Sequence, residues 1–325
     1  GDYLTLRAAS AVGSVLRRDE RATFFVKARE GVASDDRRAH VLLDLIEHVQ
    51  MSAQVKVEDR VPENMEAYVN AAREVLGPQD PMVQGGMLDL CLAFNGRGDF
   101  ANSTRVAQQL LAYVGEPHDT QSFFCAYEAL SALYFASNAG GDLPHAAALA
   151  MRQAELADRF LPAANLNNAR AHARAARMLL EAGLDKELAF QHATQAVTGT
   201  PALLAENEGW STFHEAIYGW ALRERGQQRF ALEVLEARVR REVAMKTKVM
   251  PWVVMQRNVV MADCKMDLGD LEGVDELLAA AWVGYDEWGD PKWPTVRVIR
   301  KAQARYDALT GTTSPRLNPL AHQAP

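Results

Sequence analysis

The chain has 325 residues, of which 48% are hydrophobic, 24% charged and 8% aromatic, a composition typical of a folded globular protein. Alanine accounts for 53 residues and isoleucine for only 3, which favours helices and argues against an all-β fold. The formal net charge is -7 and the pI is near 5.7, which argues against a general nucleic-acid or anionic-membrane binder.

The cysteines lie far apart in the sequence, at Cys91, Cys125 and Cys264. An odd number without close spacing indicates neither a disulfide framework nor a zinc site, so we expect buried free thiols. No apolar run approaches the roughly 20 residues that a membrane helix needs, and residues 1–20 carry charged side chains where a signal peptide would be apolar. Because the chain begins with Gly1, we expect it to be part of a longer protein, with any membrane segment outside it.

Glycines recur at a nearly constant interval along the chain. They are 43, 42, 43 and 43 residues apart, at Gly98, Gly141, Gly183, Gly226 and Gly269. Asp59 and Asp19 continue the series towards the N-terminus at intervals of 40 residues. A fixed period of this length is the signature of a repeat protein, and it predicts seven units.

Each unit is expected to hold two helices joined by a tight turn, because glycine ends the first helix and aspartate caps the second. Prolines fall between units, where they cannot disturb a helix interior. The first helices are expected at residues 2–16, 36–56, 83–97, 120–139, 165–182, 206–225 and 252–268. The second helices are expected at residues 20–32, 62–76, 100–114, 143–160, 186–198, 228–247 and 271–287.

The chain is expected to divide into four segments. Residues 1–80 are predicted to form atypical N-terminal helical repeats because they lack the glycine turn, and residues 81–291 the regular repeats. Residues 292–310 contain an amphipathic helix that would cover the open end of the stack, as terminal repeats must. The tail at 311–325, with three prolines, is expected to be disordered.

Small residues, glycine and proline follow one another within the units in a recurring order. In the fifth unit they are Ala176, Gly183, Ala189, Ala193, Ala196 and Pro201. This order resembles the tetratricopeptide repeat (TPR), and the period of about 43 resembles its long-helix variety in kinesin light chains and bacterial signalling proteins. The resemblance implies an all-α fold, a right-handed α-α superhelix of about seven helix pairs closed by a C-terminal capping helix.

The end of the chain carries a second resemblance, in Tyr285, Trp288 to Pro291, Pro294–Thr295 and Arg305–Tyr306. These residues look like the closing segment of repeat regions attached to bacterial serine/threonine kinases. The resemblance implies the sensor or regulatory region of such a protein, which often follows a membrane helix and lies outside the cytoplasm. Unpaired cysteines are more typical of a reducing compartment, so periplasmic and cytoplasmic locations both stay open.

The motifs of common enzyme classes are missing from this sequence. It has no GxxxxGK[ST], GxGxxG, HExxH or GxSxG, and it lacks the HRD and DFG loops of kinases. Its 8 histidines show no ligand spacing, and neither a metal nor a cofactor is predicted. The chain is therefore predicted to be non-catalytic, with a catalytic domain allowed outside it.

Candidate binding residues lie on the first helices, which line the concave face in TPR proteins. The residues three positions before the turn glycines are Asn95, Asn138, Leu180, Arg223 and Met266, and Trp220 lies six positions before Gly226. Asparagine donates and accepts hydrogen bonds, so Asn95 and Asn138 are predicted to hold the backbone of an extended peptide.

A local cluster of arginines indicates the charge of the ligand. Arg170, Arg174 and Arg177 have the spacing i, i+4 and i+7 on one helix, and Arg223 lies on the next first helix. Because arginine binds carboxylates through paired hydrogen bonds, these residues predict an acidic peptide. The alternative is a surface whose arginines pair with nearby Glu181 and Glu224.

These observations lead to a hypothesis of a non-catalytic module that binds a protein or peptide, with no nucleic-acid partner. Its favoured context is the sensor or regulatory region of a bacterial signalling protein. The alternatives are a stand-alone cytosolic scaffold or chaperone-like adaptor and, least favoured, an enzyme with an unrecognised site. The sequence leaves the partner, the compartment, the oligomeric state and the pairing of the first two units open.

Overall fold

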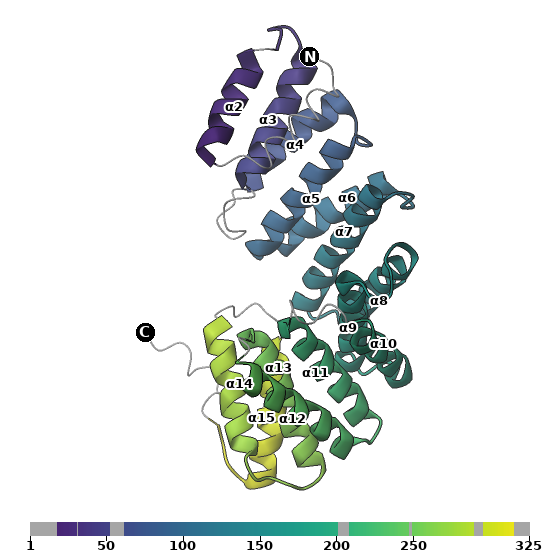
Figure 1. Ribbon diagram of the computed structural model, residues 1–325, viewed down its shortest axis with the longest axis vertical. Helices are drawn as coiled ribbons and strands as arrows, with labels where there is room; N and C mark the ends of the chain where they lie inside the picture. The colour runs from purple at the N-terminus through teal and green to yellow at the C-terminus, as the bar shows by residue number, and fades with distance from the viewer. Residues whose placement is uncertain are drawn as a thin grey trace. The chain divides into compact units, whose positions relative to one another are not determined.

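The computed structural model describes residues 18–30, 32–52, 62–200, 208–246, 249–288 and 295–314. These residues form fourteen helices and no strand (Figure 1). The helices are α2 Arg18–Glu30, α3 Arg37–Ser52, α4 Pro62–Leu76, α5 Pro81–Gly96, α6 Phe100–Val114, α7 Thr120–Ala139, α8 Leu143–Phe160, α9 Leu166–Glu181, α10 Lys186–Thr198, α11 Glu208–Glu224, α12 Gln228–Met245, α13 Pro251–Asp267, α14 Val274–Trp288 and α15 Thr295–Thr310. The expected helix at 2–16 lies outside the described residues, as do 315–325 of the expected tail.

The turns between paired helices form as their sequence predicts. All five turn glycines have positive φ, between 65° and 82°. Asp99 accepts a hydrogen bond from the Asn102 amide at 3.1 Å and Asp185 one from the Leu188 amide at 3.0 Å, so aspartate caps the helices that follow. The turn before α12 differs, because Gln227 makes no side-chain cap.

One expected helix begins late. The second helix after Gly269 was expected to start at residue 271, but α14 starts at Val274. Asp270 accepts a hydrogen bond from the Glu272 amide, and Gly273 has a φ of 70°. A left-handed residue cannot belong to a helix, so the turn extends three residues further than the glycine repeat predicts.

The chain divides into two compact units, Gly1–Ala136 and Ser137–Pro325, and the division falls within α7. In the first unit α3 packs against α4 and also contacts α5, the next first helix. Phe25 of α2 is fully buried against Leu42, Leu43 and Ile46 of α3. The helices α3 and α4 therefore pack as a pair.

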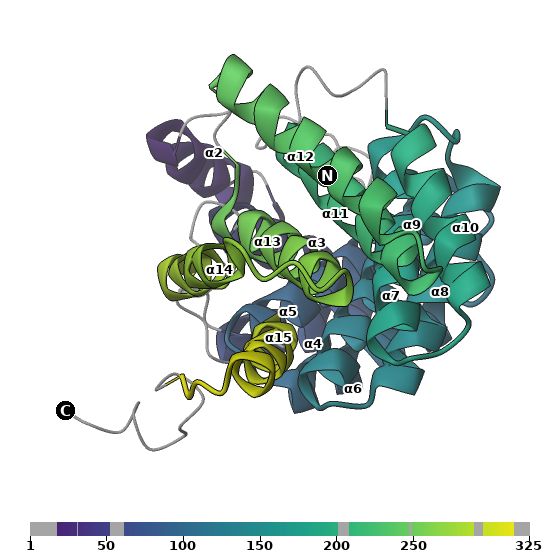
Figure 2. The ribbon, with the colours of Figure 1, turned by 90° about the horizontal axis from the view of Figure 1, so that it is seen from below.

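The second unit is a stack of helix pairs. Figure 2 shows α9 beside α10 and α11 beside α12, and both pairs are in contact. The first helices α9, α11, α13 and α15 each contact the next one, and each second helix also contacts the following first helix. This pattern buries every helix against its neighbours in the stack, which is the packing of a solenoid.

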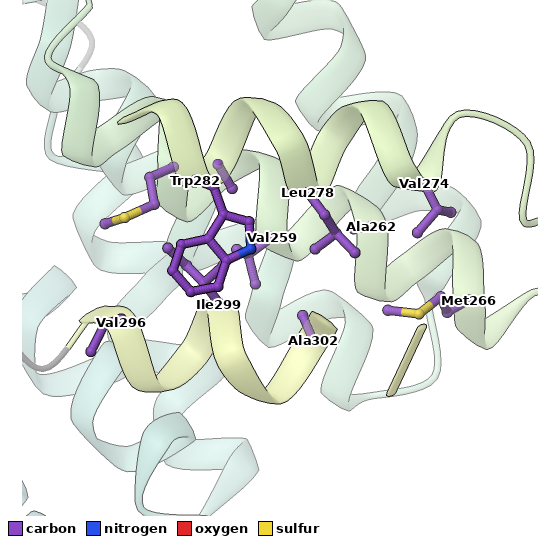
Figure 3. Close-up of a cluster of buried hydrophobic side chains, with 11 residues drawn as sticks. Val259, Ala262, Met266, Val274, Leu278, Trp282, Val296, Ile299 and Ala302 are labelled. Carbon is purple, nitrogen blue, oxygen red and sulfur yellow. The ribbon is translucent and has the colours of Figure 1, made fainter. Parts of the chain in front are cut away.

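The terminal helix α15 completes the core of the second unit. Ile299 of α15 and Trp282 of α14 are buried in one apolar cluster with Val259 of α13 (Figure 3). The Nε1 atom of Trp282 donates a hydrogen bond of 3.2 Å to Gln303 of α15. The last repeat thus buries its open side against α15. Within the part of the chain that the structure describes, no helix has the length and apolar character needed to span a membrane.

Candidate binding site on the first helices

Charged side chains on the first helices of the second unit form two sets of ion pairs, one between α9 and α15 and one among α11, α13 and α15. We call these residues the first-helix network: Arg177 and Glu181 of α9, Arg223 of α11, Asp263 and Asp267 of α13, and Arg297 and Arg305 of α15. The stacking of α11, α13 and α15 brings Arg223, the two aspartates and Arg305 together, because residues at similar places in successive repeats become neighbours, whereas Arg297 meets Glu181 across the stack.

Arg223 is held by two carboxylates of the next first helix. Its Nε lies 2.6 Å from Asp267 Oδ2, and its Nη1 lies 3.2 Å from Asp263 Oδ2. Arg305 approaches the same two carboxylates from α15, at 2.5 Å from Asp267 and 3.3 Å from Asp263. Arg223 was predicted to bind an acidic ligand, but it is already paired within the chain.

Burial and ion pairing compete at these carboxylates. Burial acts to raise the pKa of Asp267, but the hydrogen bond from Arg223 lowers it below its ordinary value. Burial raises the pKa of Asp263, and the charges of Arg223 and Arg305 offset this only in part. The network therefore links three first helices through alternating charges, Arg223 on α11, the aspartates on α13 and Arg305 on α15.

The three predicted arginines of α9 contact different neighbours. Arg170 lies over the ring of Trp210 at 3.9 Å and donates a hydrogen bond to Asn167. Arg174 donates one of 3.2 Å to Gln153 of α8. The contacts of Arg170 and Arg174 thus differ from those of Arg177, which pairs with Glu181 of its own helix.

Arg177 is buried and faces an acidic side chain of its own helix. Its side chain is only 8% exposed, and its Nε lies 3.6 Å from Glu181 Oε2. Neither Nε nor Nη2 of Arg177 has a hydrogen-bond partner. This edge of the guanidinium has the geometry to bind a carboxylate through two parallel hydrogen bonds, and a ligand carboxylate would have to compete with Glu181 for it.

Asn138 is engaged from the opposite end of the second unit. Arg297 of α15 donates a hydrogen bond of 3.0 Å to the Asn138 carbonyl and one of 2.7 Å to its side-chain Oδ1. Arg297 also reaches Glu181 of α9 at 3.0 Å. Asn138 was predicted to hold a peptide backbone, and the structure shows that its side-chain acceptor is occupied by an arginine of the chain itself.

The remaining predicted residues lie elsewhere. Asn95 is in the first unit, and its buried Oδ1 has no hydrogen-bond partner. Trp220 is only 8% exposed, so its ring packs inside the second unit and offers little surface to a ligand.

Sequence reasoning missed most of the acidic half of this network and all of its α15 residues. The sequence does contain a signal for Asp263, which occupies the same repeat position as the predicted site residues Arg177 and Trp220. Glu181 was noted only as a possible partner of the arginines. The sequence contains no such signal for Arg297 and Arg305. No described helix follows α15, so the position of these residues within a repeat cannot be read from a turn glycine.

A polar chain with titratable groups joins α8, α9 and α10. The Nε2 of His172 lies 2.9 Å from Asp158, and its Nδ1 lies 2.8 Å from Nδ1 of His192. Burial and the nearby His172 lower the pKa of His192 to about 4. In the described ranges, no group of three or more His, Cys, Asp or Glu side chains is placed to hold a metal ion. All three cysteines are buried free thiols, as predicted.

Comparison with solved structures identifies the fold. The crystal structure of BtubC (BKLC) from P. vanneervenii matches 79% of this chain and 92% of its own, with a TM-score of 0.50 and 13% sequence identity. The chain has a TPR-like helical-repeat fold. The predicted TPR-like solenoid is therefore confirmed. Because the sequence identity to BtubC is only 13%, the similarity concerns the fold alone.

A second solved structure also matches the chain. It is a putative kinesin light chain of Podospora anserina with nearly identical TPR-like repeats, covering 65% of this chain and 98% of its own, with a TM-score of 0.48 and 16% identity. No protein-family model matches the sequence of this TPR-like chain, and no curated protein matches it. The resemblance to kinase-attached repeats stays a prediction.

Proposed function

We propose that this chain is a non-catalytic module that binds a protein or peptide through the first helices of its second unit. The first-helix network carries the proposal, because it gathers donors and acceptors from α9, α11, α13 and α15 at one set of stacked helices. A stack of helices offers many such positions in register, which suits an extended polypeptide better than a small molecule.

The acidic ligand that the sequence predicts now depends mainly on Arg177. Arg223 pairs with Asp263 and Asp267, Arg174 donates to Gln153, and Arg170 stacks on Trp210. An acidic peptide would have to compete with these contacts. The proposal therefore specifies a polypeptide ligand and leaves an acidic one as a prediction.

Partner capture with two matched charge reversals tests the proposal. The whole chain, as wild type, Arg174→Glu and Arg152→Glu, is used to retain proteins from the source organism, and retained proteins are quantified by mass spectrometry. Arg174 is half-buried on the first helix α9, whereas Arg152 is exposed on the second helix α8. We expect at least tenfold lower retention with Arg174→Glu alone. Equal retention by all three proteins contradicts the use of the first helices.

We further propose that the module serves as the sensor or regulatory region of a bacterial signalling protein such as a serine/threonine kinase. The support is the resemblance of the C-terminal residues to the closing segment of kinase-attached repeat regions. Of these residues, Tyr285 and Tyr306 pack on the terminal apolar cluster. Residues 289–294 lie outside the described ranges. The alternative is a stand-alone scaffold or chaperone-like adaptor. The coding sequence around this chain decides between them: a kinase domain in the same reading frame supports the first, and a short protein without one supports the second.

A further inference from the structure

Three acceptor oxygens of the second unit converge on the guanidinium of Arg297. They are the carbonyl and the Oδ1 of Asn138 and the Oε1 of Glu181, at 3.0, 2.7 and 3.0 Å. Asn138 is 1% exposed and the Glu181 side chain 7%, whereas the Arg297 side chain is 37% exposed. The acceptors are thus fixed within the protein, and the arginine enters from the solvent side. We call Asn138 and Glu181 the acceptor pair.

The acceptor pair is suited to a cation by its place in the helices. Asn138 is the second-last residue of α7, and Glu181 is the last residue of α9. The C-terminal ends of helices carry partial negative charge from carbonyls that lack partners within the helix. The carboxylate of Glu181 adds a negative charge, which faces Arg177 through Oε2 and Arg297 through Oε1, so the pair is suited to cationic side chains.

The arginine that occupies the pair comes from the far end of the stack. From α9 to α15 there are three contacts between successive first helices, α9 with α11, α11 with α13 and α13 with α15. Neighbouring helices lie about 8–10 Å apart, so a straight stack would separate α9 from α15 by roughly 25–30 Å. The 3.0 Å contact between Arg297 and Glu181 therefore shows that the second unit curls until α15 reaches α9.

Arg297 does not form hydrogen bonds with every acceptor oxygen of the pair. Glu181 Oε2 has no hydrogen bond, although Nε of Arg177 lies 3.6 Å from it, and Nε of Arg297 has no hydrogen bond either. Buried carboxylate oxygens without a hydrogen bond are costly, because they have lost water without replacing it. An arginine that approaches from outside is free of the constraint of α15, so it can bind Oε1 of Glu181 and compete with Arg177 for Oε2 in the paired manner that Arg297 does not achieve.

We propose that the acceptor pair is a binding site for an arginine side chain of a protein partner, and that Arg297 occupies it in the absence of that partner. We expect arginine and not lysine as the ligand. The planar guanidinium of arginine holds its N–H donors in fixed directions that match the three acceptor oxygens of Asn138 and Glu181. This inference rests on the proposed function and names one contact of it. The partner's arginine displaces Arg297 and thereby releases α15 from α7 and α9.

Binding of a small arginine probe to a variant without Arg297 tests the site. N-acetyl-arginine-N-methylamide is titrated into the whole chain as wild type and as Arg297→Ala, and binding is followed by NMR shifts and by the melting temperature. We expect Arg297→Ala to bind the probe at least tenfold more tightly than the wild type does. The citrulline analogue has the same shape without the charge, and we expect no measurable binding of it.

Two further variants distinguish a ligand-binding site from an ion pair that only stabilises the fold. Adding Glu181→Gln to Arg297→Ala should weaken binding of the arginine probe at least tenfold, and Arg297→Met serves where Arg297→Ala folds poorly. Equal binding of the two probes, or equal binding by wild type and variants, overturns the inference. Because the probe needs no partner protein, these results stand apart from the capture experiment: failed capture with selective arginine binding leaves the site intact and counts against the polypeptide ligand alone.

Discussion

The imidazole rings of His172 and His192 meet through their Nδ1 atoms, which lie 2.8 Å apart. Asp158 accepts a hydrogen bond from Nε2 of His172, which fixes the proton of neutral His172 on Nε2. The Nδ1 of neutral His172 accepts from Nδ1 of His192, whereas a charged His172 donates from both ring nitrogens. Protonation of His192 would place a charge in a half-buried position beside the imidazole of His172. The pKa of His192 is therefore lowered to about 4, mainly by burial and secondly by His172.

This pair predicts a loss of stability in mild acid. An unfolded histidine has a pKa near 6.5, whereas His192 folded has one of about 4. Between pH 6.5 and 4 the unfolded chain binds more protons, so the free energy of unfolding falls as the pH falls. His214 contributes in the same direction, because burial and then Arg170 lower its pKa to about 3.

Replacement of His192 by glutamine should flatten this dependence. We expect His192→Gln to lose less stability than the wild type between pH 7 and 4.5, by about 1–2 kcal/mol after allowance for partial exposure. Urea unfolding across this pH range measures it. His145→Gln is the control, since His145 is exposed at the start of α8 and its removal leaves the pair untouched. Parallel curves for His192→Gln and wild type would contradict the assignment.

Glu242 of α12 is predicted to be the most sensitive carboxylate of the second unit. It accepts hydrogen bonds from Arg238 at 3.1 Å and from Arg257 of α13 and Thr212 of α11. All four residues are buried. Glu242→Gln leaves two buried guanidinium groups without their shared countercharge, so we expect the free energy of unfolding to fall by about 3–5 kcal/mol.

Urea unfolding of a matched pair of variants checks the role of Glu242. Glu236→Gln makes the same chemical change on the same helix, where Glu236 lies 3.7 Å from Arg240 and both side chains are at least half exposed. We expect that control to change stability by less than about 0.5 kcal/mol. Similar losses from the two variants would show that the buried network adds nothing beyond a surface pair.

Two helical glycines are predicted to respond to alanine with opposite signs. A Cβ at Gly284 of α14 would lie 2.7 Å from the Pro251 carbonyl oxygen of α13, whereas one at Gly85 of α5 would meet nothing within 4 Å. We expect Gly284→Ala to destabilise the protein by about 1–3 kcal/mol through forced separation of the helices. Gly85→Ala should stabilise it by up to about 1 kcal/mol, because alanine favours the helix. Thermal unfolding followed by circular dichroism distinguishes these signs, and a stabilising Gly284→Ala would refute the close approach.

The packing of α15 can be measured at Ile299. Its side chain is fully buried between α13 and α14. We expect Ile299→Ala to lower the free energy of unfolding by about 2–5 kcal/mol, through lost apolar contact and the cavity left behind. Leu309→Ala on the same helix is the control, since Leu309 is 53% exposed and should contribute less than about 0.5 kcal/mol. Denaturation by urea gives both values, and an unchanged midpoint for Ile299→Ala would show that α15 does not close the core.

The sequence alone was sufficient to predict where most helices begin and end. Gly98 and Gly183 adopt positive φ, and Asp99 and Asp185 cap the helices after them. These effects act within a few residues along the chain, so a reader of the sequence can apply them directly. The same reasoning misplaced the start of α14, because Gly273 extends the turn by a second left-handed residue outside the 43-residue pattern.

The contacts of the candidate site were decided by tertiary structure. Arg297 meets Glu181 across 116 positions and Asn138 across 159, and Arg223 meets Asp267 across 44. A repeat of about 43 residues predicts the last of these as a contact between neighbours. It does not predict the first two, because the curl of the stack accumulates from small rotations between many helix pairs. Local residues therefore determined the helices and their turns, while the summed packing of α9 to α15 determined which charges meet.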